Sequence, residues 1–237
     1  MKYRLARQQS CPETDKVIAN VIKRQKIAIP RASEKVLKEI AQVSKLIEKE
    51  GLPSYLVCKK LPGELGRGIF LHPEAKPIKR GQTIAPYSGV ISLIPQNEGG
   101  DSNYAFSSLN DLRINKEEHE LLNSKQRFHP RRLYWVSLDA EKRGNFTRFI
   151  NHSSKPNVDA HLLRIPKNSH GLHPSPAEII YIANRTIHPG EQLLVCYEDE
   201  DKSYWGALKI KPFPMTPKTF TIDPSGNLKK QTGRNAL

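Results

Sequence analysis

The stretch from Tyr134 to Asn157, YWVSLDAEKRGNFTRFINHSSKPN, constrains this chain more than any other. Its apolar start predicts a short strand to Leu138, and a polar turn through Gly144 follows. A brief helix or turn then leads into Asn-His-Ser, and Pro156 ends the segment. Further along, GEQLLVCYED at residues 190–199 predicts another short strand. The two stretches together predict a polar loop held between apolar strands.

From Ser54 onward the chain consists of short segments rich in β-branched residues, separated by glycine and proline. The predicted strands are 55–59, 67–71, 83–86, 89–93, 133–138, 157–164, 179–183 and 193–196. Their irregular spacing favours small curved sheets over a doubly wound α/β fold. One internal helix is predicted at 115–124, where Asn115 and Glu118 have N-cap and N3 spacing and Leu121 and Leu122 face inward.

Two helices are predicted before the strands. Thr14 or Asp15 caps the first, Pro30 breaks it, Ser33 caps the second, and Gly51 ends that one. Their apolar stripes consist of Val17, Ile18, Val21 and Ile22, and of Val36, Leu37, Ile40, Val43 and Ile47. We expect these stripes to pack on the parent domain, because neither keeps a heptad repeat long enough for a coiled coil. A dimer seam is the alternative.

The net charge of +14 on 237 residues lies at the two ends of the chain. Residues 1–60 carry +8, residues 61–200 carry +1, and residues 201–237 carry +5. Basic flanks favour polyanions such as DNA, RNA or an anionic membrane surface, and a solvated surface that maintains solubility is the alternative.

The cysteines and the hydropathy pattern limit the class of protein further. Cys11, Cys58 and Cys196 are odd in number and far apart, so they predict neither a disulfide framework nor a zinc cluster, and favour a reducing compartment. The N-terminus has charge but no apolar region after it, and no apolar run reaches about 18 residues, so we expect no signal peptide and no membrane contact.

The pattern D-A-x-x-x-G-N-x-x-R-F-I-N-H-S-x-x-P-N at 139–157, followed by G-E-x-L-x-x-x-Y at 190–197, resembles a SET-domain protein-lysine methyltransferase. The resemblance covers roughly residues 54–205 and implies a mainly β fold of small curved sheets with a knot-like core. It leaves residues 1–53 as an N-terminal helical segment and residues 206–237 as a basic, proline-rich tail. The prolines of this tail argue against regular structure there.

The resemblance implies S-adenosylmethionine as the cofactor and indicates residues for its site. The backbone of Gly66-Arg67-Gly68 would wrap the amino-acid end of the cofactor. Asn151 would bond its amino group, while the backbone of His152 would contact adenine and its ring would help to lock the loop. The remaining candidates flank or cover the cofactor, and they are Arg148, Phe149 and Trp205, the last together with Tyr204.

Two tyrosines are the catalytic candidates implied by the same resemblance. Tyr197 ends the second motif and would orient the substrate amine; a buried phenol that bonds a backbone group is the alternative. Tyr104 would line the lysine channel, although Tyr104 and Phe106 share a strand face and could simply pack. Tyr87, in APYSG, would lie near the active site or serve as an ordinary core tyrosine.

Two departures from the family pattern carry predictions. Ser154 stands where the family has a cysteine, and the Cys-rich tail that completes a zinc site is absent, so we expect no metal. Val195 stands where an aromatic residue is common, which suggests a roomier channel that could accept more than one methylation.

In size and in its missing zinc modules the chain is similar to compact bacterial SET proteins, such as the chlamydial ones, which act on histones or histone-like proteins. We therefore expect a basic, lysine-rich substrate, met through a shared DNA scaffold or through an acidic groove at Glu117, Glu118, Glu120 and 198–201. A non-histone substrate and a non-catalytic module that binds nucleic acid or chromatin are the alternatives. The expected location is the bacterial cytoplasm, or the host nucleus for a secreted effector.

Overall fold

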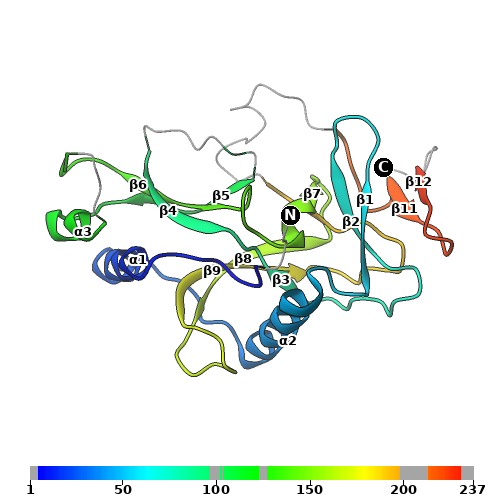
Figure 1. Cartoon of the computed structure of the whole chain (residues 1–237), viewed down its shortest axis with the longest axis horizontal. Helices are drawn as coiled ribbons and strands as arrows, with labels where there is room; N and C mark the ends of the chain where they lie inside the picture. The colour runs from blue at the N-terminus through cyan, green and yellow to red at the C-terminus, as the bar shows by residue number, and fades with distance from the viewer. Residues whose placement is uncertain (1–4, 97–101, 103, 123–126, 198–212, 231–237) are drawn as a thin grey trace. The chain divides into compact units, whose positions relative to one another are not determined.

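The structure is a computed structural model that describes residues 5–96, 102, 104–122, 127–197 and 213–230. Its helices are α1 (Pro12–Arg24), α2 (Glu34–Glu50), α3 (Lys116–Leu121) and the 3₁₀ helix η1 (Phe146–Phe149). Its strands are β1 (Leu56–Lys60), β2 (Arg67–Leu71), β3 (Thr83–Pro86), β4 (Val90–Pro95), β5 (Ala105–Leu112), β6 (Tyr134–Asp139), β7 (Asn151–His152), β8 (Val158–Ile165), β9 (Ser175–Ala183), β10 (Leu194–Val195), β11 (Phe220–Ile222) and β12 (Leu228–Lys230) (Figure 1). Short strands dominate, and this confirms the predicted fold class.

The chain forms two compact units that interleave along the sequence. The first contains residues 1–51, 86–145 and 161–180, and the second contains residues 52–85, 146–160 and 181–237. None of the helices in the described ranges is both long and apolar enough to cross a membrane.

The first unit contains an antiparallel sheet in the order β4-β6-β5. Val90 pairs with Asp139 at one end of the β4–β6 ladder and Pro95 pairs with Tyr134 at the other. β5 pairs along the other edge of β6, with two register shifts before Leu112 meets Tyr134. This sheet carries the APYSG motif, which immediately precedes β4.

Both N-terminal helices belong to this unit, and their apolar stripes are buried except for the half-buried Ile22. Ile18, Val21 and Ile40 are each at most 2% exposed. The Ser33 cap of α2 is confirmed, since its side chain accepts a bond from the Val36 amide, and Gly51 ends the helix with φ of 80°. Because the stripes are covered within the chain, they do not form an exposed dimer seam.

The predicted cap of the first helix is wrong. α1 begins with Pro12, and the Cys11 thiol accepts a bond from the Thr14 amide at 3.4 Å. Proline is favoured at the first helical position because its fixed φ suits the helix and its missing N–H would have had no partner there. The Thr14 side chain is buried instead.

The second unit contains β3, β7, β10 and the start of β8, and the five-stranded sheet has the order β3-β9-β8-β10-β7. β7 and β8 are joined by only the short loop 153–157, yet β10 lies between them and runs parallel to both. The loop therefore crosses over β10, which comes about forty residues later in the chain. This threaded arrangement corresponds to the predicted knot-like core.

The expectation that the proline-rich tail has no regular structure is wrong for residues 220–230. β11 and β12 form an antiparallel hairpin there, with Phe220 opposite Lys230 (Figure 1). Phe220 and Ile222 pack in one cluster with Leu61, Phe70 and Leu194 of the same unit. Burial of these apolar side chains stabilises a segment whose local composition favours disorder.

Candidate functional site

The second unit contains the predicted cofactor residues that the structure describes, and two of them form the edge strand β7 of its larger sheet. β7 consists of the two motif residues Asn151 and His152, and it pairs with β10 through Leu194 opposite Asn151 and Val195 opposite His152. The strand pairing therefore places the Asn-His motif directly beside the chain that leads to Tyr197. These two stretches are 45 residues apart along the sequence, measured from His152 to Tyr197.

Tyr197 is fixed by two hydrogen bonds of different kinds. Its hydroxyl donates to the carbonyl oxygen of Ile150 at 2.7 Å, and its backbone N–H donates to Nδ1 of His152 at 3.1 Å. The two rings also contact each other, with centroids 5.5 Å apart. His152 is 7% exposed. Since Nδ1 accepts a bond, the imidazole anchors the backbone of Tyr197, and in its neutral form it carries its proton on Nε2.

Asn151 connects the Asn-His motif to the glycine-rich segment. Its side-chain Nδ2 donates to the carbonyl oxygen of Arg67 at 2.8 Å. Gly66 precedes this carbonyl with φ of +68°, a conformation that favours glycine, and nothing lies within 4 Å of the place where a Cβ would stand. Open space therefore lies beside the backbone at Gly66, one residue before the carbonyl that the Asn151 amide bonds.

The other glycine of this segment is packed tightly. A Cβ on Gly68 would stand 2.6 Å from Nε2 of Gln192, whose side chain is fully buried. Gly68 is thus required by close packing of β2, whereas Gly66 is required by its backbone conformation.

The Arg67 side chain influences the half-buried thiol of Cys58 on the neighbouring strand. Burial raises the pKa of Cys58 above its ordinary value, while a hydrogen bond and the positive charge of Arg67 act in the opposite direction. The thiol therefore stays protonated at neutral pH, and a role as a nucleophile is not supported.

Arg148 and Phe149 lie in η1, which ends two residues before the Asn-His motif begins. The Arg148 guanidinium carbon lies 5.2 Å from the centroid of the Phe149 ring, and Arg148 is only 8% exposed. A cation held over an aromatic face in this way gives η1 a defined geometry where the chain enters β7.

Tyr104 belongs to the first unit, so the catalytic candidates are divided between the two units. The Tyr104 carbonyl accepts a bond from the Tyr87 hydroxyl at 2.7 Å, and the Tyr87 ring lies 5.7 Å from that of Phe106. Tyr87 is only 6% exposed, so its hydroxyl supports the Tyr104 backbone. Trp205 and the acidic residues 198–201 lie outside the described residues.

A fully buried asparagine holds the motif APYSG. Asn145 donates from Nδ2 to the carbonyl of Pro86 at 2.9 Å and to the hydroxyl of Ser88 at 2.7 Å. Gly89 approaches the Asp139 carbonyl so closely that a Cβ would stand 2.5 Å from it. Both Asn145 and Asp139 belong to the first long motif, which therefore shapes the segment near Tyr87 by direct contact.

Glu118 cannot contribute to the predicted acidic groove, because its side chain is buried. Glu118 is 3% exposed, and its carboxylate accepts bonds from the Arg24 guanidinium at 2.6 Å and from the Asn115 amide at 2.8 Å. The buried face of α3 consists of Glu118 and His119, while Leu121 and Leu122 are only half-buried, contrary to expectation. Arg24 compensates the carboxylate, so this polar face can be buried.

Asn157 is a site residue to which the sequence reasoning gave no role. It is fully buried, and its side chain donates to the Gln192 carbonyl at 2.8 Å and accepts from the Leu194 amide at 2.8 Å. It thereby holds the backbone on both sides of Leu193, where the chain enters β10. Its place at the end of the first motif, just after Pro156, was the available signal.

Within the described ranges, no three His, Cys, Asp or Glu side chains gather closely enough to hold a metal ion.

Comparisons of the sequence and of the fold with known proteins point to the same protein family. The chain is 25% identical to the N-lysine methyltransferase KMT5A-A of Xenopus laevis over 181 residues, which is 76% of this chain and 45% of that protein. It is 39% identical to the H3 lysine-4 specific histone-lysine N-methyltransferase of Schizosaccharomyces pombe over 70 residues, which is 28% of this chain and 7% of that protein. The chain thus spans less than half the length of these relatives.

Among solved structures, the fold is similar to ATXR5 in a complex with histone H3.1. The TM-score is 0.57 at 17% identity, and the match covers 85% of each chain. A sequence profile of the SET domain matches residues 66–198, which include the glycine-rich segment, both long motifs and Tyr197. This match takes in more than half of the sequence, and the chain belongs to the SET-domain family.

Proposed function

We propose that this protein is an S-adenosylmethionine-dependent protein-lysine N-methyltransferase. The observation that carries the proposal is the hydrogen bond from the Tyr197 hydroxyl to the Ile150 carbonyl, one residue before the Asn151 amide that bonds Arg67. The phenol of Tyr197 is thereby fixed next to the residue whose side chain bonds the backbone of the glycine-rich segment. Membership of the SET family and the lysine methyltransferases among the similar proteins support this proposal.

The residues present fit the cofactor. An ammonium group requires hydrogen-bond acceptors, and the Arg67 carbonyl and the Asn151 side-chain oxygen supply acceptors next to the open space at Gly66. The backbone of 66–68, Asn151 and His152 would hold the cofactor, with Arg148 and Phe149 beside it. S-adenosylmethionine would supply a methyl group on a positively charged sulfur.

The substrate lysine must lose its proton before its nitrogen can attack. Deprotonating an amine of pKa about 10.4 at pH 7 costs roughly 4–5 kcal/mol. Burial and a nearby positive charge both lower that pKa. The protein's part is then to exclude water and to align the nitrogen lone pair with the methyl group.

The Tyr197 hydroxyl suits this alignment because its proton is already donated in a hydrogen bond within the protein. Since the O–H donates to Ile150, the phenol oxygen is left as an acceptor with increased electron density. Such an oxygen can accept a hydrogen bond from the substrate amine and so orient its lone pair. It can also stabilise positive charge on the group in transfer.

We further propose a basic, lysine-rich protein such as a histone or histone-like protein as the substrate. The names of the similar proteins support this class, since two of them concern histone H3. Of the carboxylates expected to attract such a protein, Glu117 and Glu120 are exposed, but Lys116 is paired with Glu120 at 3.9 Å and Arg24 compensates Glu118, so α3 offers little net negative charge. Cytoplasmic action is also part of this proposal, supported by the three free cysteines.

The test is methyl transfer from labelled S-adenosylmethionine to core histones and to a basic nucleoid protein, with the label located by mass spectrometry. We expect label on lysine side chains and cofactor binding by calorimetry. If the cofactor does not bind and no basic protein acquires label, the non-catalytic binding module replaces this proposal. Label on other proteins alone would keep the chemistry and reject the substrate class.

Replacing Asn151 by alanine should weaken S-adenosylmethionine binding by about 10- to 100-fold. A hydrogen bond to a charged group contributes about 1.5–3 kcal/mol, and the substitution also releases the Arg67 carbonyl from its position. Calorimetric titration measures the change directly. The control is Asn184→Ala, since Asn184 bonds Asp159 at 2.8 Å in the same unit. Equal losses in both variants would contradict a specific role for Asn151.

A further inference from the structure

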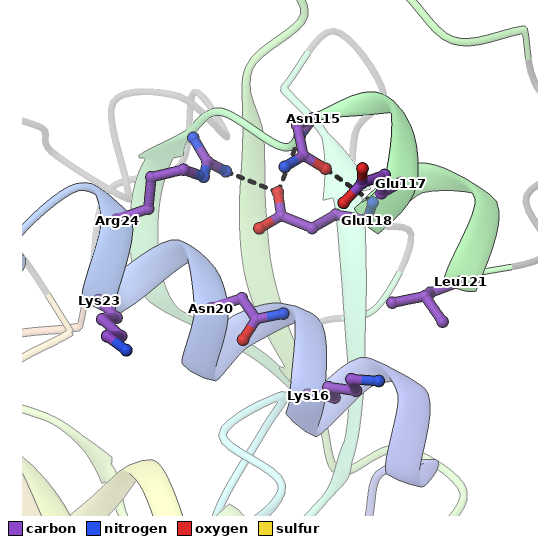
Figure 2. Close-up of a pocket in the computed structure, with 8 residues that line it drawn as sticks. All are labelled: Lys16, Asn20, Lys23, Arg24, Asn115, Glu117, Glu118 and Leu121. Atoms are coloured by element: carbon purple, nitrogen blue, oxygen red, sulfur yellow. Dashed lines mark hydrogen bonds and ion pairs between the residues drawn. The ribbon is translucent and has the colours of Figure 1, made fainter.

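A groove of about 490 Å³ lies between α1 and α3 in the first unit, formed by residues outside the proposed catalytic site (Figure 2). On α1 its lining consists of Lys16, Asn20, Lys23 and Arg24, and on the α3 side it consists of Asn115, Glu117, Glu118 and Leu121. The α1 residues are spaced four, three and one apart, which places them along one side of the helix.

The charges in this groove are unequal once its internal ion pair is taken into account. Arg24 and Glu118 compensate each other at 2.6 Å, as the dashed line in Figure 2 shows. Lys16 and Lys23 are exposed, and neither forms an ion pair within the part of the chain that the structure describes. Two available lysines thus face a single remaining carboxylate, that of Glu117.

Further cations extend this surface beyond the groove. The Arg113 carbonyl accepts a bond from Arg24 at 2.6 Å, so exposed Arg113 lies beside the end of α1. Leu112 pairs with Tyr134, which brings the segment that enters β6, with exposed Arg131, alongside the residues that follow β5. We call Lys16, Lys23, Arg113 and Arg131 the basic ridge.

We propose that the basic ridge binds the sugar-phosphate backbone of nucleic acid. Lys16 and Lys23 are seven positions apart on α1, a rise of about 10 Å, which is about three times the axial spacing of about 3.4 Å between phosphates of one strand. Lysine contacts phosphate as a point charge and carries no base specificity. We therefore expect binding to be largely independent of base sequence.

A purely structural role of the lysines and an acidic protein partner both fit the groove less well. Cations in the last turn of a helix stabilise its dipole, which accounts for Lys23 but not for Lys16 in the middle of α1. An acidic protein would require buried apolar or aromatic anchors in addition to charge, and the lining offers only the half-buried Leu121.

This inference deepens the proposed function, because a polymer that binds both the enzyme and a basic substrate would offset the repulsion between two cationic proteins. The binding itself does not depend on methyl transfer. It can therefore be tested on the full chain without cofactor, and its failure would leave the proposed catalytic activity intact.

The experiment is fluorescence anisotropy of a labelled 20-base-pair DNA duplex, titrated with full-length protein over a range of salt concentrations. In Lys16→Gln/Lys23→Gln we expect affinity to fall by at least about tenfold at 0.1 M salt, and the slope of log affinity against log salt to decrease by about 2. The matched control, Lys45→Gln/Lys49→Gln on α2, removes the same charge from exposed positions outside the ridge and should change affinity by less than about threefold.

Each result decides the proposal. No duplex binding by the wild type, or equal losses in the two double variants, would overturn it. Stronger competition by polyglutamate than by unlabelled DNA would assign the ridge to an acidic protein instead. Equal binding of an RNA duplex would support the backbone contact and show that the sugar is not read. Unchanged melting temperatures in both variants would show that the difference comes from the surface, as expected for exposed side chains.

Discussion

Replacing Tyr197 by phenylalanine should lower the rate of methyl transfer by about 10²- to 10³-fold. The substitution removes one oxygen that is held by Ile150 at 2.7 Å, and losing one preorganised polar group in an active site typically has an effect of this size. The ring itself remains, so its contact with His152 and the backbone bond from Tyr197 to that histidine should persist. Single-turnover methyl transfer to a histone measures the change.

The matched control is Tyr55→Phe. Tyr55 is half-buried in the same unit, and burial raises its pKa to about 12, so its hydroxyl is neutral throughout the working range of pH. We expect its rate to stay within about twofold of the wild type. Cofactor affinity measured by calorimetry should change little in Tyr197→Phe, because the cofactor contacts are assigned to other residues. An undiminished rate in this variant would reject Tyr197 as the orienting group.

Replacing Asn157 by alanine should destabilise the protein by about 2–5 kcal/mol. The substitution leaves the Gln192 carbonyl and the Leu194 amide without partners in the interior, and each such group costs about 1–3 kcal/mol. It also releases the entry into β10, which leads directly to Tyr197. We therefore expect the methyl-transfer rate to fall along with the stability.

Urea denaturation of both proteins measures this loss, provided that unfolding is two-state. Asn184→Ala is again the comparison, because Asn184 is half-buried and its side chain bonds Asp159 at 2.8 Å, so it should lose no more than about 1.5 kcal/mol. A loss in Asn157→Ala no greater than that of the control would show that β10 stays in place through its strand pairing alone.

Much of the local structure follows from the sequence. β2 and β3 have the predicted bounds, the Asn115 capping box of α3 is present, and Ser33 caps α2. Each of these depends on residues within a few positions of one another. The residues of the candidate site were predicted from two motifs in a fixed order. These motifs can be recognised in the sequence without any knowledge of the structure between them.

Two features could not be predicted from the sequence, because each depends on residues far apart along the chain. Glu118 is buried only because Arg24, 94 positions away, compensates its charge. The proline-rich end folds into β11 and β12 because Phe220 and Ile222 find an apolar partner in Phe70. In both cases local composition indicated the opposite, and non-local contacts determined the outcome.

For the threading of β10, the family resemblance implied a knot-like core but did not indicate which strands form it. The sequence by itself determined which side chains are available, namely Asn151, His152 and Tyr197, and that short strands carry them. Only the tertiary structure decided that β10 lies between β7 and β8, where the Asn157 side chain satisfies two backbone groups. A buried backbone polar group must have a partner, and which residue supplies it depends on the threading of the whole chain.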